Sequence, residues 1–360
     1  MSDKTGQGAR TATIADVAAR AGVSTATVSR ALAKPDSVRA ETVALVMEAV
    51  RACGYTPNSS ARMLRTQRTQ MVLVVVPSIA NQMYSHVLRG VDTALAPAGY
   101  GVIIGNLDSA PGNQSRLVEL AFARQVDAII LLCGYIPGSH GRTLVEAGLP
   151  IVSLCAPIGH PSIPDVCADD EAGGREAGRF LASLGHRRLA YAAGPKGSVV
   201  DTARWTQFRA AALAAGIADH DIVRVEGDAG ARFSFVSGMA AGERFLAIPD
   251  RPTAVFCASD EIAMGLMKVV RRAGLRVPGD VSVVGFDGID QVDYLDPVLS
   301  TMRQPRQEIG RRGAEVLLRM LDGTSTPDDH AIRLPVELLS RESTAPWRPA
   351  PRARLKDVRG

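Results

Sequence analysis

No stretch of the sequence approaches the roughly 18 consecutive apolar residues that a membrane-spanning helix needs. The opening segment MSDKTGQGARTAT is polar and lacks the apolar core of a secretory signal. Aromatic residues make up only 4% of the chain, so the interior must be built mainly from Ala, Val and Leu. At 360 residues the chain exceeds one compact core, which predicts two or three domains. We expect a globular protein of the cytoplasm, with no membrane partner.

The signatures of several enzyme classes are missing as well. The sequence contains no G-x-x-x-x-G-K-[ST] phosphate loop, no G-x-S-x-G nucleophile turn and no H-E-x-x-H zinc helix. Its five cysteines form no C-x-x-C pair, and its six histidines show no metal-ligand spacing. We therefore expect reduced cysteines, and neither catalytic residues, a metal nor a cofactor.

Charge is distributed unevenly along the chain. Residues 1–70 hold ten Lys and Arg against five Asp and Glu, and the last twenty residues hold six against two. The intervening body therefore carries a net charge of −5, since the whole chain has +4. A basic head on a mildly acidic body is typical of a DNA-binding domain attached to a domain that does not bind DNA. A solvated basic tail is the alternative.

The segment TIADVAARAGVSTATVSRAL predicts two short helices joined by a tight turn. Apolar residues recur at helical spacing, at Ile14, Val17, Ala18 and Ala21. Thr13 is a suitable N-cap for the first helix, Gly22 a suitable end, and Ser24 a suitable N-cap for the second. A third helix is expected over 41–52, with an inner side made of Val43, Val46, Met47 and Val50.

The second helix carries small residues and an arginine on its outer side, at Thr25, Ala26, Ser29 and Arg30. Two helices with a Gly-containing turn and such a surface form a helix-turn-helix, whose second helix fits the major groove of DNA. Small residues permit close approach to base edges, and Arg30 can reach guanine or a phosphate. An ordinary three-helix bundle with a polar surface is the alternative.

The next segment, GYTPNSSARMLRTQRT, predicts a turn at Pro57, an N-cap at Asn58 and a short helix bearing Ala61 and Leu64 beside three arginines. A helix of this length is marginally stable alone, so we expect it to fold on contact with DNA. Its small and apolar residues would enter the minor groove, where Leu64 would wedge between base steps and kink the duplex. A flexible basic linker is the alternative.

From Met71 onward, short apolar strands alternate with helix-length segments. The first series is MVLVVVPS, YGVIIGN, DAIILLC and PIVSLC, and the second is HRRLAYAAG, DIVRVEGD, PTAVFCAS and VSVVGFD. Such strands indicate parallel sheets that are covered on both faces. The expected fold is therefore a three-helix head and a hinge helix, followed by an α/β body of two doubly wound, parallel-sheet lobes.

These elements define the expected domain boundaries. The chain divides into a head, a hinge, a body and a basic tail, at 1–57, 58–70, 71–345 and 346–360. The tail is rich in Pro and Arg and is expected to be disordered. Within the body, lobe one is expected to hold 71–168 and 299–328, and lobe two 169–298 and 329–345. This assignment places the strand VLSTM in lobe one and the segment IRLPVELL in lobe two.

Side chains suited to binding a polar molecule follow several of these strands, at the sheet edge where doubly wound folds bind ligands. They are Asn81, Tyr84, Asp170, Arg204, Phe233, Asp260 and Asp287. Carboxylates accept hydrogen bonds from vicinal hydroxyls, an arginine fork binds two acceptors, and an aromatic ring stacks on a sugar or base. An Asp after a buried strand is also a common N-cap, so Asp170 has a purely structural alternative.

The order of these motifs resembles the lactose-repressor family, and most closely its cytidine-repressor-like branch. The resemblance is carried by TIADVAARAGVSTATVSRAL, KPDSV and GYTPNSSARML, and it extends through the two-lobed body. It implies that Thr25 and Ala26 set the DNA sequence preference, supported by Ser29 and Arg30. It further implies that Leu64 is the wedge of the hinge.

For the body, the resemblance implies a core like that of periplasmic sugar-binding proteins, with Arg204 and Asp287 in a pocket between the lobes. The chain departs from the family pattern where Gln82-Met83 follows Asn81 in place of a Pro-aromatic pair. It departs again where 228–232 is inserted before Phe233. Both places border the expected pocket, so the ligand need not be cytidine.

Together these features predict a ligand-responsive, sequence-specific transcriptional regulator, a repressor that senses a nucleoside or sugar. We expect a homodimer, because two heads read a palindromic operator on neighbouring turns of DNA. A transport-type binding protein would share the body, but it requires a signal peptide and no basic head. An enzyme of nucleoside or sugar metabolism requires a catalytic group that the sequence does not show.

Overall fold

The computed structural model describes residues 12–56, 68–108, 112–228 and 232–348. The chain divides into two compact units, Met1–Thr69 and Gln70–Gly360. The first unit is the head, whose described helices are α1 (Ile14–Ala21), α2 (Thr25–Ala33), the short 3-10 helix η1 (Pro35–Ser37) and α3 (Ala40–Cys53). The hinge positions Asn58, Ala61 and Leu64 lie outside the described residues.

Local capping interactions set the limits of the first two helices, as the sequence predicts. Thr13 forms a capping box with Asp16, and α1 ends at Gly22, whose φ of 67° favours a residue without a side chain. Ser24 Oγ accepts the backbone N–H of Thr27 and starts α2.

The three helices of the head enclose a small apolar core of Val17, Ala18, Val28, Ala31, Val46 and Ala49. Along α3, the prediction that Met47 faces inward is wrong, because its side chain is 42% exposed. Ala49 is buried instead. A small residue suits that place because α1 packs closely on α3.

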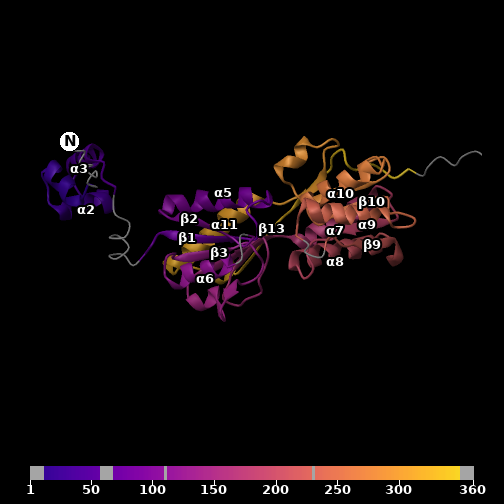
Figure 1. Ribbon diagram of the computed structural model, residues 1–360, viewed down its shortest axis with the longest axis horizontal. Coiled ribbons are helices and arrows are strands. Elements are labelled where there is room, and N and C mark those ends of the chain that lie inside the picture. The colour runs from indigo at the N-terminus through magenta and orange to yellow at the C-terminus, as the bar shows by residue number, and fades with distance from the viewer. Residues whose placement is uncertain (1–11, 57–67, 109–111, 229–231, 349–360) are drawn as a thin grey trace, which may run out of the picture. The chain divides into compact units, whose positions relative to one another are not determined.

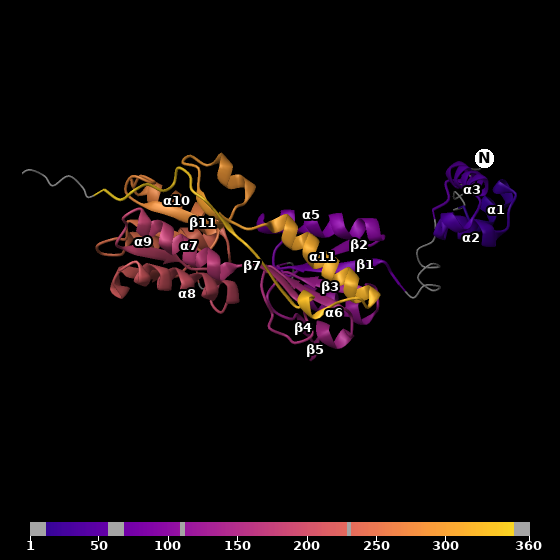
Figure 2. The same ribbon diagram turned by 180° about the vertical axis from the view of Figure 1, so that it is seen from behind.

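Lobe one of the body contains a six-stranded parallel sheet in the order β13-β7-β6-β3-β1-β2. Its strands are β1 (Met71–Val76), β2 (Gly101–Asn106), β3 (Ala128–Leu131), β6 (Ile151–Leu154), β7 (Asp165–Ala168) and β13 (Ala331–Leu334). Helices α5 (Met83–Leu95) and α11 (Arg306–Asp322) lie side by side on one face of the sheet, and α6 (Asn113–Phe122) covers the other (Figures 1 and 2). A small hairpin, β4 (Gly138–Ser139) and β5 (Arg142–Thr143), follows β3.

The residues of β1 show how the pleat divides the core of lobe one. Val72, Val74 and Val76 belong to the apolar cluster on the side of α5 and α11. Leu73 and Val75 belong to the cluster on the side of α6. Alternate side chains of a strand point to opposite faces, so a strand between two helical layers must be apolar throughout.

Lobe two contains a second six-stranded sheet, in the order β14-β12-β11-β10-β8-β9. Its strands are β8 (Leu189–Ala192), β9 (Ile222–Val225), β10 (Ala254–Cys257), β11 (Ser282–Asp287), β12 (Ser300–Arg303) and β14 (Glu337–Leu339), of which only β14 is antiparallel. Helix α7 (Asp170–Ser183) packs on α8 (Val199–Ala214), and α9 (Phe235–Leu246) packs on α10 (Asp260–Arg272). A 3-10 helix, η5 (Asp290–Tyr294), joins β11 to β12.

The chain passes between the lobes three times, and the last two crossings differ from the prediction. The strand VLSTM was assigned to lobe one, but β12 pairs with β11 in lobe two. The chain returns to lobe one only with α11, which packs on α5. A strand of four residues fits either sheet, and its partner is decided by tertiary packing.

The expectation that the segment IRLPVELL rejoins lobe two is correct only for its second half, because the segment forms two strands in different lobes. β13 pairs with β7 in lobe one, whereas β14 pairs with β12 in lobe two. Pro335 lies between them, and a proline has no N–H to donate to a sheet. The break at Pro335 lets the chain leave one sheet and enter the other.

Within the described ranges, no helix is both long enough and apolar enough to span a membrane. None of the five cysteines is in a disulfide. Cys155, Cys167 and Cys257 are buried, and burial raises the pKa of each of these thiols. The buried cysteines are therefore packed as small apolar residues.

Candidate functional site

The surface of α2 that the sequence assigns to DNA is turned away from the core of the head. Thr25, Ala26 and Arg30 are exposed and Ser29 is half-buried. On the opposite side of the helix, Val28 and Ala31 are buried. The exposed positions include the first residues of α2, which in a helix-turn-helix contact base edges.

The second candidate site lies where the two lobes of the body meet, and we call it the inter-lobe cluster: Asn81, Tyr84, Asp170, Arg204, Phe233, Asp260 and Asp287. Its centre is an ion pair in lobe two. Asp170 Oδ1 accepts from Arg204 Nε at 2.8 Å and from Nη2 at 2.7 Å. Arg204 Nη1 donates to the carbonyl of Ala258 at 2.5 Å. All three nitrogens of the guanidinium are thus held by the protein.

The surroundings of this pair are largely apolar. Arg204 is only 4% exposed, and its guanidinium carbon lies 3.6 Å from the centroid of the Phe286 ring and 5.7 Å from that of Phe233. Burial raises the pKa of Asp170, and the charge of Arg204 opposes that effect. Each charge therefore depends on the other, because an unpaired charge in such a place is costly.

Asp287 ends β11, with its backbone at a φ of 117°, in the region that favours glycine. Its Oδ1 accepts from Gln304 Nε2 at 2.7 Å. Burial raises the pKa of Asp287 to about 6, although the positive charge of Arg204 acts to lower it. A buried carboxylate in a strained backbone conformation is typical of a functional site.

Asp260 supports the turn that carries Asp287. It is fully buried, and its carboxylate accepts the hydroxyl of Thr301 at 2.6 Å and the backbone N–H of Ile289 at 2.8 Å. Burial raises the pKa of Asp260 to about 8, and the nearby charge of Asp287 adds to this effect. The structure thus gives this predicted ligand residue partners within lobe two.

Lobe one contributes Asn81 and Tyr84 to the cluster. Asn81 Nδ2 donates to the carbonyl of Phe233 at 3.1 Å, which joins the two lobes directly. Burial raises the pKa of Tyr84, and the charges of Asp287 and Arg204 act on its hydroxyl in opposite directions. The structure therefore brings all seven predicted residues into one region.

Two residues that the sequence analysis missed also lie in this region. The Glu261 carboxylate accepts the backbone N–H of Gln82 at 3.4 Å, and burial raises its pKa to about 7. Gln304 is 3% exposed, and its Oε1 is without a hydrogen-bond partner among the described residues. Glu261 follows Asp260 directly and could have been noticed. Gln304 could have been identified from the sequence only if β12 had been assigned to lobe two.

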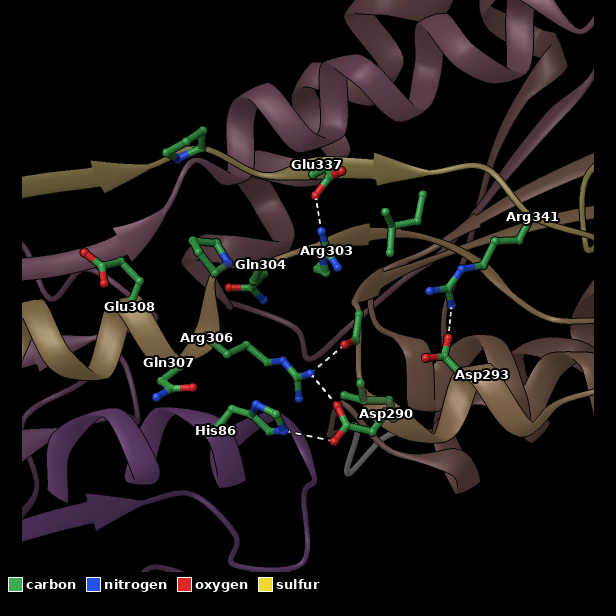
Figure 3. A pocket seen from close by; sticks show the side chains of 15 residues that line it. His86, Asp290, Asp293, Arg303, Gln304, Arg306, Gln307, Glu308, Glu337 and Arg341 are labelled. Atoms are coloured by element: carbon green, nitrogen blue, oxygen red, sulfur yellow. Dashed lines mark hydrogen bonds and ion pairs between the residues drawn. The ribbon is translucent and has the colours of Figure 1, made fainter. Parts of the chain in front are cut away.

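A cavity of about 480 Å³ lies beside the cluster, at the last two crossings of the chain (Figure 3). It is lined by residues of the turn after β11, of the β12–α11 crossing and of β14, together with His86 of α5. The lining is rich in charged side chains, including Asp290, Arg306 and Arg341. Within the described residues, no group of three His, Cys, Asp or Glu side chains is arranged to hold a metal ion.

Two family models match the chain. Residues 13–58 match the bacterial regulatory proteins of the lacI family, and residues 179–344 match a periplasmic binding protein-like domain. The first match covers the described helices of the head, and the second covers most of lobe two together with α11 and β13 of lobe one.

Several curated relatives match over nearly their whole length. The HTH-type transcriptional repressor CytR of Escherichia coli (strain K12) is 34% identical over 333 residues, which cover 92% of this chain and 96% of the relative. The HTH-type transcriptional regulator CelR of Thermobifida fusca is 34% identical over a match that covers 93% of this chain and 98% of the relative.

Solved structures of related proteins have the same fold. A lac repressor dimer bound to operator and the anti-inducer ONPF has a TM-score of 0.77 at 27% identity, covering 93% of this chain and 100% of the other. A complex of CelR with cellobiose has a TM-score of 0.68 at 32% identity, covering 92% and 99%. Since the curated relatives match both the head and the two-lobed body at such identity, the chain belongs to the lacI family of bacterial regulatory proteins.

Proposed function

We propose that this protein is a transcriptional repressor that reads operator DNA with α2 and senses a small polar effector between the two lobes of its body. The observation that carries the proposal is a capped helix-turn-helix with an exposed Thr25, Ala26 and Arg30 surface, on the same chain as a two-lobed body. The curated relatives described above are transcriptional regulators, which supports a role without catalysis.

For DNA, each exposed residue of α2 has a specific role. Thr25 and Ala26 lie at the start of the helix, where small side chains let the backbone approach the base edges. Arg30 makes a bidentate contact to guanine or holds a phosphate, with Ser29 beside it. Asn58, Ala61 and Leu64 of the hinge remain part of this proposal, with Leu64 as the minor-groove wedge.

We further propose that the protein acts as a homodimer. The lac repressor, which has the same fold, is a dimer in its complex with operator. One helix-turn-helix contacts only a half-site, and two related by a twofold axis read a palindrome. The dimer would also present two hinge segments to the minor groove.

The inter-lobe cluster favours an uncharged effector that is rich in hydroxyl groups. The carboxyl groups of Asp170 and Asp287, and that of Glu261 beside the cluster, accept hydrogen bonds from hydroxyls. The Arg204 guanidinium is already held by Asp170 and by the Ala258 carbonyl, so it is not free to bind a phosphate. Phe233 offers a ring on which a sugar or base stacks. Related structures contain cellobiose and ribose, which fit this chemical class.

The experiment is a titration of the full chain with duplex DNA, in the presence and absence of candidate effectors. The duplex would be selected from a randomised palindromic library. The effectors would be cytidine, ribose and cellobiose, each compared with ribose 5-phosphate as an anionic control. We expect salt-sensitive, sequence-specific binding that changes with an uncharged effector and not with the phosphate. A chain that binds no duplex at low salt would refute the proposal.

A further inference from the structure

Asp290 of lobe two lies between two side chains of lobe one (Figure 3). Its Oδ2 is 2.9 Å from His86 Nε2, on α5, and its Oδ1 accepts from Arg306 Nη2 at 3.0 Å, at the start of α11. Asp290 is the first residue of η5, which belongs to lobe two. One carboxylate thus joins two helices of lobe one to a turn of lobe two.

The two lobe-one partners are held together as a unit. A Cβ added at Gly90 of α5 would lie 2.0 Å from the carbonyl oxygen of Gln307 of α11, and one at Gly310 would lie 2.0 Å from that of Val87. The backbones of α5 and α11 are therefore in direct contact at both glycines. Because the helices pack this closely, His86 and Arg306 have little freedom to move independently of each other.

Arg306 is tied to lobe two a second time. It is only 7% exposed, and its Nη2 also donates to the carbonyl of Gly288 at 2.6 Å. If the Asp290 side chain moved away, the buried guanidinium of Arg306 would keep its hydrogen bond to the Gly288 carbonyl but lose its charged partner. Because Asp290 itself is 62% exposed, the cost of this loss is modest, and it makes the position of Asp290 affect how the lobes sit together.

The turn that carries Asp290 also carries Asp287 of the inter-lobe cluster. The backbone carbonyl of Asp287 accepts the N–H of Gln304 at 3.1 Å, and its side chain accepts from Gln304 Nε2. Gln304 stands two residues before Arg306 in the same crossing. The turn after β11 is therefore attached to the β12–α11 crossing at two points, through Asp287 to Gln304 and through Asp290 to Arg306. A ligand that contacts Asp287 acts on this turn.

We infer that Asp290 is an inter-lobe latch, through which a ligand bound at Asp287 changes the position of α5 and α11. The inference rests on the proposed function and adds the element that couples the ligand to lobe one. Asp290 itself is a positioning residue, since it contacts His86 and Arg306 and is not in the inter-lobe cluster. Its side chain is 62% exposed, so the contact is weak enough to be broken and formed by ligand binding.

The chain offers a matched control for this latch. Asp293 lies three residues along the same 3-10 helix, is similarly exposed at 57%, and pairs with Arg341 at 2.5 Å. Asp293 and Arg341 both belong to lobe two, so this pair does not join the lobes. Asp290→Asn and Asp293→Asn thus remove the same charge from the same surface, and only the first breaks an inter-lobe contact.

The first measurement needs no ligand. Hydrogen exchange of the full chain would compare the wild type with Asp290→Asn, Asp293→Asn, His86→Ala and His86→Gln. We expect faster exchange at the start of α5 in Asp290→Asn and His86→Ala, and wild-type exchange there in Asp293→Asn. His86→Gln keeps a donor and should largely restore protection. Equal exchange at the start of α5 in Asp290→Asn and Asp293→Asn would overturn the inference.

The second measurement is the ratio of operator affinities with and without an effector, taken from cytidine, ribose or cellobiose. We expect this ratio to fall about fivefold or more in Asp290→Asn and to stay at the wild-type value in Asp293→Asn. If the wild type responds to the effector and Asp290→Asn keeps the full affinity ratio, the latch is overturned. The proposed function would not be affected by that result. A wild type that binds these ligands with no effect on the operator would overturn both.

Discussion

Arg232 of lobe two forms an ion pair with Asp108 of lobe one, with Nη1 and Oδ1 2.5 Å apart. Arg232 belongs to the stretch 228–232 that departs from the family pattern, and the next residue, Phe233, accepts the hydrogen bond from Asn81. The last residue of the inserted stretch and the residue that follows it therefore both contact the other lobe. Any effector held between the lobes would be enclosed in part by these contacts.

We predict that Arg232→Ala weakens effector binding without changing operator affinity in the absence of the effector. Both side chains are partly exposed, so the loss is expected to be at most about 1 kcal/mol, or roughly fivefold in Kd. Isothermal titration with an effector would measure it. Arg209→Ala removes an exposed ion pair to Asp219 within lobe two and is the control. An equal effect of the two variants would contradict the prediction.

We predict that Arg204→Ala abolishes the effector response and also destabilises the body. The variant leaves Asp170 buried without its cation, and breaking such a pair costs about 3–5 kcal/mol. Urea unfolding of the full chain would measure this cost, and a gel shift would show whether operator binding survives. The double variant Arg204→Ala/Asp170→Ala should recover part of the stability but no effector response. A single variant as stable as the wild type would show that Asp170 does not depend on Arg204.

Glu261 makes the stability of the body depend on pH. Burial raises its pKa from 4.5 to about 7, so the folded state holds the proton more tightly than the unfolded state. The stabilisation that results is fully present below pH 4.5 and is lost as the pH rises through about 7. A shift of this size corresponds to about 3 kcal/mol.

We therefore predict that Glu261→Gln, which stays neutral, matches the wild type near pH 4 and exceeds it in free energy of unfolding at pH 8 by about 3 kcal/mol. Urea titrations at several pH values would measure the difference. Glu171→Gln, at an exposed position in the first turn of α7, should follow the wild type throughout. A constant difference between Glu261→Gln and the wild type across this range would contradict the assignment.

At the DNA surface, Arg30→Ala should weaken binding to the selected operator by about 1–3 kcal/mol, because it removes a contact to a base or phosphate. Arg30 is exposed on the side of α2 away from the buried Val28 and Ala31, so the melting temperature should not change. Fluorescence anisotropy on the operator and on a scrambled duplex would measure the effect. Arg51→Ala, on α3, is the control, and an equal loss there would argue against groove contact by Arg30.

Leu64→Ala should weaken operator binding and reduce bending of the DNA while the body stays folded. Leu64 lies outside the described residues, so this prediction rests on the sequence and on the wedge mechanism. Circular-permutation gel shifts would measure the bend angle. An operator that is bent equally by the variant and the wild type would count against the wedge.

The sequence determined the head in detail, because its limits depend on short-range interactions. Thr13, Gly22 and Ser24 act within a few residues of their own positions, so they can be interpreted without knowing the rest of the fold. The strands of the body were also evident, since buried parallel strands are apolar throughout. The seven candidate ligand residues come together because parallel strands end at the same edge of a sheet.

Only the tertiary structure decided which strand joins which sheet and which polar group bonds to which. The prediction for the lobes of β12 and β13 is wrong, because the residues of a four-residue strand do not specify its distant partner. The pairing of Asp170 with Arg204, and of Asp290 with His86, joins residues 34 and 204 positions apart. The first contact forms only when lobe two has folded, and the second only when the two lobes have met, so local sequence patterns encode neither.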